Sequence, residues 1–432
     1  MDSMAIKVQK ISINDRASVQ KILNRAKSDL SAAVSTVIPI LQEIEKKGDS
    51  AIRSYTERFD RIQLNQFAFP VKNCDKNIEE SWKKAFQKAA ENIESFHKTQ
   101  MPKDYEVTIS GNQLGIKYSP IESVAVYAPG GKALYPSSIL MGAIPARIAG
   151  VKNISLFTPP DSSGKVNPIL AYVAELAGID TIYTIGGAQA IGAAAYGTQT
   201  VKKSDFVVGP GNRYVAAAKS YLSSIGVIGI ESIAGPSEVF IIADESANPE
   251  WVATDMLSQA EHGEDSVAIL ATTSESLAEE VEKELIKALK SRTKRKNIKE
   301  KSIHENSFLL VMKSMDECFE LSNLYAPEHL EIMTKNYRKD FDKILHAGSV
   351  FLGNYSPVAM GDYISGTNHI LPTAGLSRIY SPLGVDSFLK RVTYQEITPD
   401  SLRELQPYVD ILSTLEGLDE EHGTSVKIRL NS

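Results

Sequence analysis

The first element that the hydrophobic pattern predicts is a helix near the start of the chain. Between residues 32 and 45, apolar side chains recur every three or four positions, which is the spacing of one helix face. Gly48 follows them and is typical of a helix end. We therefore predict a helix with one buried face. Its apolar positions are Val34, Val37, Ile38, Leu41 and Ile44.

From residue 123 onward, short runs of β-branched residues alternate with helical segments. Such alternation is typical of parallel strands joined by right-handed crossovers, with helices covering the sheet. The pattern therefore predicts an α/β fold. The predicted strands are 124–127, 154–157, 181–185, 206–208, 239–242 and 267–271, and a further helix is predicted from residue 251.

Several of these strands run directly into turns rich in glycine and proline. In open α/β sheets, ligands bind beyond the carboxyl ends of strands, where turn N–H groups and helix N-termini meet anions. The middle of the chain therefore favours a dinucleotide or phosphate region, although glycine turns also serve as plain connections. The pattern GxGxxG is absent, because Tyr214 stands at its last position, and no GxxxxGK[ST] run occurs. The turns are 128–131, 186–187, 209–212 and 235–238.

The segment after residue 383 differs from the rest of the chain. Residues 388–412 have a mixed, helical pattern, and residues 415–432 form a short acidic stretch followed by an extended tail. We interpret this segment as a separate arm. Arms of this kind often reach a partner subunit.

Composition narrows the class of protein. The 432 residues allow two or three compact units at roughly 150 residues per domain. Hydrophobic residues make up 43% and charged residues 23%, so extensive disorder is not expected. The net charge of −6 argues against a nucleic-acid partner, because phosphate neutralisation needs a basic face. One basic run, residues 287–301, is interpreted as a solvated helix end and loop.

The two cysteines, Cys74 and Cys318, lie far apart and neither belongs to a Cys-x-x-Cys pair. A disulfide framework and a cysteine zinc site are therefore not expected. The first residues lack the apolar core of a secretory signal, and no apolar run approaches the roughly 18 residues of a membrane span. The sequence thus predicts a cytoplasmic protein without a membrane partner.

Three of the seven histidines lie in runs with carboxylates or amides that suit metal binding or proton transfer. Gln259 and His262 are three positions apart and share a helix face, although this pair alone also fits a buried polar network. Asp362 lies in a Gly-rich loop after an apolar strand, and a buried carboxylate needs a cation. With a second imidazole from His422, these oxygen and nitrogen donors suit zinc.

Glu328 and His329 follow Pro327 and have two interpretations. Proline in the first turn and glutamate near its positive end are typical of a helix start. Alternatively, the two form an acid/base pair, in which each positioned group contributes roughly 10²–10⁴-fold to the rate. His369 is a further proton handler or a substrate contact. Because Cys318 lies in a helical context that favours packing, aldehyde oxidation would need activated water, and Glu328 fits that role.

With these residues assembled, the chain closely resembles the histidinol dehydrogenase family along nearly its whole length. The resemblance implies two Rossmann-like α/β/α lobes, related to the aldehyde dehydrogenase fold, with a small domain-swapped C-terminal tail. The matching motifs are 48–49, 127–131, 186–190, 209–212, 234–238, 258–262, 326–329 and 361–373.

The resemblance also suggests domain boundaries. Residues 1–25 would form an N-terminal segment, and residues 26–128 with 239–382 a discontinuous lobe that carries the metal and catalytic residues. Residues 129–238 would form the NAD-binding lobe, and residues 383–432 a dimerisation tail.

The activity implied by the resemblance is oxidation of L-histidinol through L-histidinaldehyde to L-histidine, with two hydride transfers to NAD. These are the last steps of histidine biosynthesis. Glu328 would activate water and His329 would act as base and acid. One zinc ion per subunit would be held by Gln259, His262, Asp362 and His422, the last from the other subunit of a homodimer. The other implied substrate contacts are Ser237, His369 and Glu416, and the implied NAD contacts are Tyr127, Gln189 and Asn212.

Two departures from the family pattern leave room for other readings. Residues 231–233 read Glu-Ser-Ile where an aspartate is more usual, and one extra residue precedes His422, which we expect to bulge outward. The alternatives are a related NAD-dependent zinc enzyme acting on another small alcohol, a zinc hydrolase in which Glu328 activates water without a cofactor, and a metal-binding dimeric scaffold.

Overall fold

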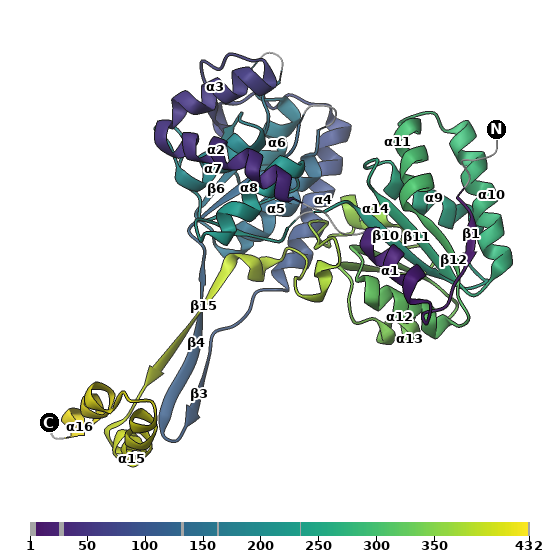
Figure 1. The fold of residues 1–432 in the computed structure, drawn as a ribbon. Coiled ribbons are helices and arrows are strands. Elements are labelled where there is room, and N and C mark those ends of the chain that lie inside the picture. The colour runs from purple at the N-terminus through teal and green to yellow at the C-terminus, as the bar shows by residue number, and fades with distance from the viewer. Residues whose placement is uncertain (1–5, 26–29, 131–133, 162–163, 234, 431–432) are drawn as a thin grey trace.

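Two lobes and a long arm make up the protein (Figure 1). The computed structural model describes residues 6–25, 30–130, 134–161, 164–233 and 235–430. Gly131, which belongs to a predicted turn and a matching motif, and Ala234, which belongs to another matching motif, lie outside these ranges. In the described part of the chain, no helix is both long enough and apolar enough to span a membrane.

The first lobe is built on a six-stranded sheet in which every pairing except that of β2 with β7 is parallel. In spatial order the strands are β2 (Ala68–Pro70), β7 (Thr181–Tyr183), β6 (Asn153–Phe157), β5 (Ser123–Tyr127), β8 (Phe206–Val208) and β9 (Gly229–Ile230).

Helices cover both faces of this sheet and bury its β-branched side chains. One face carries α4 (Glu80–Lys98), α5 (Pro136–Ala149) and α6 (Pro168–Ala177), preceded by the short η1 (Val71–Asn73). The other face carries α2 (Ser31–Lys47), α3 (Asp49–Asp60), α7 (Gly187–Tyr196) and α8 (Arg213–Ser224). The predicted helix over residues 32–45 is thus confirmed as α2, which ends at Gly48.

The second lobe has an all-parallel six-stranded sheet. In spatial order its strands are β1 (Val8–Lys10), β12 (Phe308–Val311), β11 (Val267–Thr272), β10 (Glu238–Ala243), β13 (His329–Met333) and β14 (Ser349–Leu352). Every strand predicted from the sequence is present in one of the two sheets.

Two layers of helices also enclose the second sheet. One layer contains α9 (Pro249–Ala260), α10 (Glu275–Ser291), α11 (Lys296–Lys301), η2 (Ser302–Asn306) and α14 (Val358–Tyr363). The other contains α1 (Arg16–Arg25), α12 (Met315–Tyr325), α13 (Tyr337–Asp340) and η3 (Phe341–Lys343). Cys318 is buried in α12, so the packing role expected for it is confirmed.

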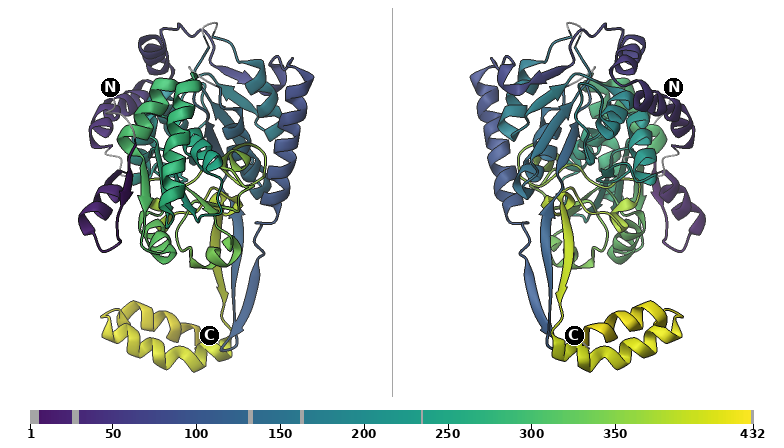
Figure 2. Two further views of the ribbon diagram at one scale, coloured as in Figure 1. Left: turned by 90° about the vertical axis from the view of Figure 1, so that its right-hand side faces the viewer. Right: turned by 90° about the vertical axis from the view of Figure 1, so that its left-hand side faces the viewer.

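The arm is a three-stranded antiparallel ribbon that projects away from the lobes and ends in helices (Figures 1 and 2). Its strands are β3 (Tyr105–Ile109), β4 (Asn112–Pro120) and β15 (Leu389–Glu396), followed by α15 (Pro399–Leu415), η6 (Asp419–Gly423) and α16 (Thr424–Leu430). The sequence predicted an arm, but the strand β15 and the helix α16 were missed. The short turns η4 (Leu376–Arg378) and η5 (Val385–Phe388) precede the arm.

The predicted domain boundaries were wrong in three respects. Residues 26–128 were assigned to the lobe that contains 239–382, yet β5 lies between β6 and β8 in the first sheet. The N-terminal segment is not separate, because β1 pairs with β12 of the second lobe. The assignment of residues up to 128 failed because β5, α5 and β6 form a local crossover unit, and such units pair within one sheet. Residues 383–388 also differ from the prediction, since Leu383 and Phe388 are buried in the first lobe.

Candidate active site

Glu328 and His329 lie at the amino edge of the second sheet, where α12 leads into β13. Both side chains are almost completely buried. The helix start predicted at Pro327 was wrong, because these residues form a turn and His329 is the first residue of a strand. The carboxylate Oε2 of Glu328 lies 3.4 Å from Nδ1 of His329. The two side chains are therefore close enough to interact.

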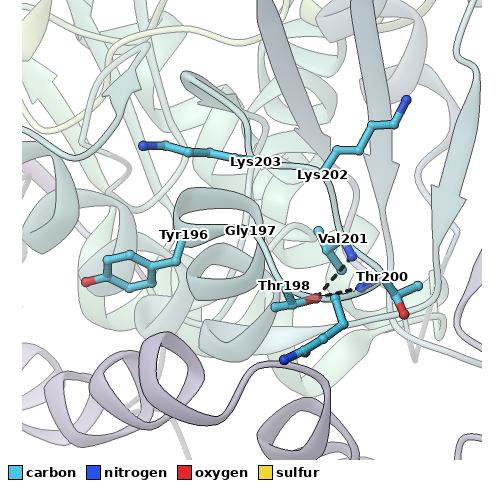
Figure 3. Close-up of a pocket in the computed structure, with 8 residues that line it drawn as sticks. Tyr196, Gly197, Thr198, Thr200, Val201, Lys202 and Lys203 are labelled. Atoms are coloured by element: carbon cyan, nitrogen blue, oxygen red, sulfur yellow. Dashed lines mark hydrogen bonds between the residues drawn. The ribbon is translucent and has the colours of Figure 1, made fainter.

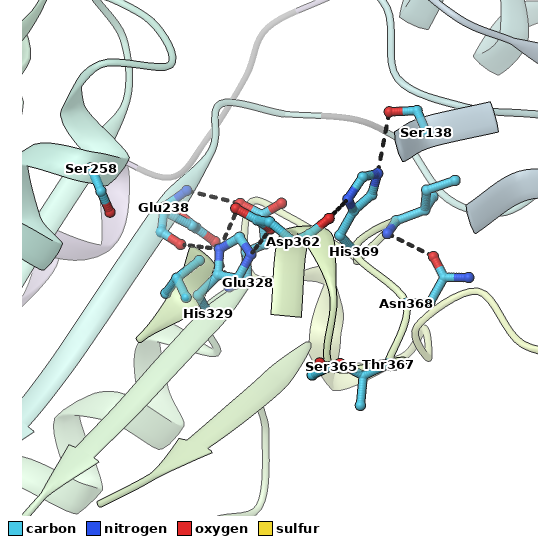
Figure 4. A network of polar contacts seen from close by, with 12 residues as sticks. Ser138, Glu238, Ser258, Glu328, His329, Asp362, Ser365, Thr367, Asn368 and His369 are labelled. Carbon is cyan, nitrogen blue, oxygen red and sulfur yellow. Dashed lines mark hydrogen bonds and ion pairs between the residues drawn. The ribbon is translucent and has the colours of Figure 1, made fainter. Parts of the chain in front are cut away.

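The second imidazole and carboxylate of the site come from the segment after β14. Asp362 lies in α14, not in a loop as predicted, and its Oδ1 is 3.8 Å from Nε2 of His329. His369 Nδ1 lies 2.8 Å from the backbone carbonyl of Asp362. The other ring nitrogen of His369 lies 3.2 Å from the hydroxyl of Ser138 in α5. His369 thus joins the two lobes at the site (Figure 4).

The ionisation of His329 is controlled by the neighbouring carboxylates. Burial lowers the pKa of His329, but Glu328 and Asp362 outweigh burial and raise it to about 9. The Nδ1–H of His329 donates to the backbone carbonyl of Glu238 at 3.0 Å. Nε2 is buried and has no hydrogen-bond partner among the described residues. That nitrogen is therefore the atom at which His329 can exchange a proton.

The predicted metal donors are only partly assembled by one chain. Gln259 is buried near the end of α9, and its amide nitrogen has no hydrogen-bond partner within the described ranges. His262 follows the helix and is exposed. Glu261 lies close enough to Tyr363 to raise the pKa of that phenol, after the larger effects of burial and Asp362. The ends of α9 and α14 are therefore neighbours, so that Gln259 and Asp362 belong to the same region.

Of the remaining candidates, Ser237 is adjacent to the site, whereas Glu416 and His422 lie far from it. Ser237 immediately precedes β10, and its carbonyl accepts from Val267 N–H at 3.1 Å. Glu416 immediately follows α15 and His422 lies in η6, and both are exposed at the far end of the arm (Figure 1). In the part of the chain that is described, no group of three or more histidine, cysteine or acidic residues is arranged to hold a metal ion. A single chain thus does not complete the predicted donor set.

The three predicted NAD contacts lie together at the carboxyl edge of the first sheet. Tyr127 ends β5, Gln189 is in the first turn of α7, and Asn212 precedes α8. The phenol oxygen of Tyr127 accepts from Gly187 N–H at 3.1 Å, and burial raises the pKa of Tyr127 to about 12. Asn212 caps α8 by accepting from the N–H groups of its first turn. The N-termini of α7 and α8 lie at this edge, and helix N-termini commonly bind anionic ligands.

A buried ion pair supports the turn after β8. Lys219 Nζ lies 2.6 Å from Glu231 Oε1, and both side chains are nearly inaccessible. Lys219 also donates to the Gly209 carbonyl at 3.0 Å, and Gly209 N–H donates to Glu231 at 2.9 Å. Glu231, at one of the positions where this sequence departs from the family pattern, therefore fixes the backbone of the turn.

Glu238 is a buried residue of the site for which no role was predicted from the sequence. It is the first residue of β10 and contacts both Glu328 and His329. The only sequence signal was its place at the end of the turn at 235–238, which does not distinguish a functional carboxylate from a structural one.

A shallow hollow of about 490 Å³ lies at the other end of α7 (Figure 3). It is lined by residues 196–203, none of which was a predicted site residue. Thr198 and Thr200 bond to Asp49 there, so the threonine hydroxyls serve the fold. This hollow is thus separate from the candidate active site.

Comparisons with known proteins identify the family. A family profile described as histidinol dehydrogenase matches residues 23–430. Histidinol dehydrogenase of Leptospira interrogans is 57% identical over 427 residues, covering 99% of this chain and 100% of that protein. The Methanocaldococcus jannaschii protein of the same name is 44% identical and covers 98% of each. The crystal structure of histidinol dehydrogenase from Elizabethkingia anophelis has a TM-score of 0.92 at 40% identity, with 98% of both chains covered. The chain therefore belongs to the histidinol dehydrogenase family of NAD-dependent oxidoreductases.

Proposed function

We propose that this protein oxidises L-histidinol through L-histidinaldehyde to L-histidine in the last steps of histidine biosynthesis, with two hydride transfers to NAD and a zinc-anchored substrate. The observation that carries the proposal is the cluster of Glu328, His329, Asp362 and His369 between the lobes. It combines a buried acid/base pair with a carboxylate that faces it.

The proton transfers are assigned to Glu328 and His329. In the first oxidation, His329 in its neutral form takes the hydroxyl proton at Nε2 while the carbinol hydride passes to NAD. In the second, Glu328 takes a proton from the water that adds to the aldehyde, and the hydrate gives a second hydride to another NAD. The fixed Nδ1–H bond to Glu238 supports this assignment, because it leaves Nε2 free for the substrate.

The proposed zinc donors are Gln259, His262, Asp362 and, from the partner subunit, His422. The burial of Gln259 near the end of α9 and the position of Asp362 beside that helix support the first three. Oxygen and imidazole donors of this kind suit zinc with a position open to substrate. When bound, zinc would anchor the imidazole and amine of the substrate. Asp362 would then share its charge with the metal, which weakens one of the contributions that raise the pKa of His329.

We also propose a cytoplasmic homodimer in which each arm reaches the other subunit. The exposed apolar residues of the arm support the proposal, since monomers rarely expose contiguous apolar surface of this kind. They include Val107, Ile109, Val392, Tyr408, Ile411, Leu412, Leu415 and Ile428. The arm would carry Glu416 and His422 of the partner subunit to the site, where Glu416 would join Ser237 and His369 as a substrate contact.

For NAD, we propose contacts from Tyr127, Gln189 and Asn212. Their support is the carboxyl edge of a parallel sheet with the N-termini of α7 and α8 beside it. The neutral phenol of Tyr127 and the amides of Gln189 and Asn212 would supply polar contacts to the nucleotide. The phosphates would meet backbone N–H groups in place of a GxGxxG loop.

The proposal is tested by incubating the purified protein with L-histidinol and NAD and following formation of NADH. We expect two NADH for each histidinol consumed. Glu328→Gln should slow oxidation of L-histidinaldehyde by about 10²–10⁴-fold, because it removes the group that takes a proton from water. Glu320→Gln, on the exposed face of α12, is the matched control and should leave the rate unchanged. Normal aldehyde oxidation by Glu328→Gln would show that the base is misassigned.

A further inference from the structure

Glu238 is a buried carboxyl group that none of the proposed steps uses. It is the first residue of β10, and only 1% of its surface is exposed. Its strand lies between β11 and β13, so it is held within the centre of the second sheet. A carboxyl group in such a place is costly unless it is neutral or well bonded. Its contacts therefore indicate what it does.

The side chain of Glu238 bonds to both ends of the turn that leads into β13. Its Oε2 accepts from the hydroxyl of Tyr325, the last residue of α12, at 2.7 Å. Its Oε1 accepts from the backbone N–H of Glu328 at 3.2 Å. Between these two contacts lies Ala326, with φ of 54°. That left-handed conformation costs about 1 kcal/mol for an L residue and persists only where surrounding contacts hold it.

The backbone of Glu238 orients the two proposed catalytic side chains. Its N–H donates to Glu328 Oε2 at 2.9 Å, and its carbonyl accepts from His329 Nδ1–H at 3.0 Å (Figure 4). The backbone thus fixes the carboxylate and the imidazole, while the side chain fixes the main chain that carries them. Both parts of Glu238 act on the same pair of residues.

The charge of Glu238 is set by its surroundings. Burial raises its pKa, Tyr325 opposes that effect, Glu328 raises the pKa further, and the net value is about 8. Two carboxylates in contact cannot easily both ionise. At neutral pH the proton therefore resides on Glu238.

We propose that Glu238 is a positioning residue of the reaction, a neutral carboxyl group that holds the turn presenting Glu328 and His329. This inference rests on the roles proposed above for those two residues. If the neutral carboxyl group of Glu238 is the form that holds the turn, the amide of a glutamine should be able to replace it. The oxygen of a glutamine can accept from Glu328 N–H, and its NH₂ can donate to the Tyr325 oxygen.

The test compares Glu238→Gln with Glu238→Ala in the zinc-loaded, full-length enzyme, with NADH formation from L-histidinol as the readout. For Glu238→Ala we expect kcat to fall about 10²-fold with KM changed less than about threefold, because displacement of the catalytic groups by about 1 Å has an effect of that size. For Glu238→Gln we expect kcat within about threefold of wild type, since its hydrogen bonds are retained. A residue that served stability alone would not show this split and rescue.

Two results would overturn the inference: an unchanged kcat in Glu238→Ala, or an equal loss of kcat in the Gln and Ala variants. Should the Ala variant fail to fold, Tyr325→Phe takes its place, because it removes only the hydroxyl that bonds to Glu238. Its kcat should fall about tenfold, and an unchanged value contradicts the inference. Glu328→Gln separates the two claims, since full activity in that variant counts against the role of Glu328 and not against that of Glu238.

Discussion

Several carboxyl groups are buried behind the proposed catalytic pair, and their ionisation limits the charge of the site. Burial raises the pKa of Asp255 to about 6. Burial and then Asp255 raise the pKa of Glu331 well above its usual range, although Val358 N–H donates to this carboxyl at 3.1 Å. Near neutral pH, Glu238 and Glu331 therefore keep their protons, whereas Asp255 is mostly ionised above its pKa of about 6. The negative charge that a cation meets at the site is thus smaller than the number of buried carboxyl groups suggests.

The proton on Glu238 predicts a pH dependence of stability. The folded protein keeps this proton up to about pH 8, whereas the unfolded chain releases it near 4.5. Between these values the folded state binds more protons, so the contribution of Glu238 to the free energy of unfolding falls as pH rises and levels off above about pH 8. Glu238→Gln lacks this contribution. Its stability relative to wild type should therefore rise by up to about 1 kcal/mol per pH unit from pH 5.5 to 7.5.

Urea unfolding of both proteins at several pH values, followed by circular dichroism, measures this difference. Glu320→Gln is the control, because its side chain is exposed to solvent, and its difference from wild type should not change with pH. A constant difference between Glu238→Gln and wild type would mean that Glu238 is ionised in the folded protein.

Individual residues show how much of the candidate site could be predicted from the sequence. Glu328 and His329 stood out because histidine is scarce and the pair adjoins proline. The same proline and glutamate also suggested a helix start, which was wrong. Pairing of β13 with β10 and β14 decides the local structure there, and no local pattern contains that pairing. Glu238 was missed for the same reason, since its role depends on Tyr325 and on a turn about ninety positions away.

The two halves of the proposed site lie at different ends of the strands: at the carboxyl ends in the first lobe and at the amino ends in the second. In the first lobe, Tyr127 and Asn212 lie at carboxyl ends of strands, where the sequence predicted ligand contacts. In the second lobe, Glu238 and His329 are the first residues of their strands. Alternation of strands and helices revealed the strands but not their neighbours, because pairing across a sheet depends on long-range packing.

The turn after β8 gives a prediction at this scale. Gly209 has φ of 113°, and an added Cβ would lie 2.0 Å from the Tyr127 carbonyl oxygen. Gly209→Ala should therefore displace the turn, lower stability by about 3 kcal/mol and raise the KM for NAD about tenfold. Thermal unfolding and the NAD dependence of the rate measure these effects.

Gly226→Ala is a matched control in the same lobe. Gly226 also has a positive φ, 74°, but an added Cβ would meet nothing within 4 Å. Its replacement should cost about 1 kcal/mol from backbone conformation alone and leave the KM for NAD unchanged. Equal effects of the two substitutions would show that close approach to Tyr127 does not constrain the turn.

At the scale of the whole molecule, the chain builds an interlobe site and carries other proposed contacts far from it. The contact of His369 with Ser138 brings the two lobes together. The arm holds Glu416 and His422 at the opposite end of the molecule (Figure 2). The sequence indicated an arm after residue 383 but not that residues 105–120 supply two of its strands, since a ribbon between distant segments leaves no local signature.

This geometry predicts complementation between two inactive variants. His422→Ala should lose zinc and activity, and Glu328→Gln should lose aldehyde oxidation. If His422 serves the partner subunit, a hybrid dimer of the two contains one intact site, formed by Glu328 of one chain and His422 of the other. Co-refolding equal amounts should then restore roughly 25% of wild-type activity, because half of the dimers are hybrids and each has one working site. Separately tagged chains allow the hybrid to be purified and its zinc and rate measured. An inactive hybrid dimer would show that His422 does not act across the interface.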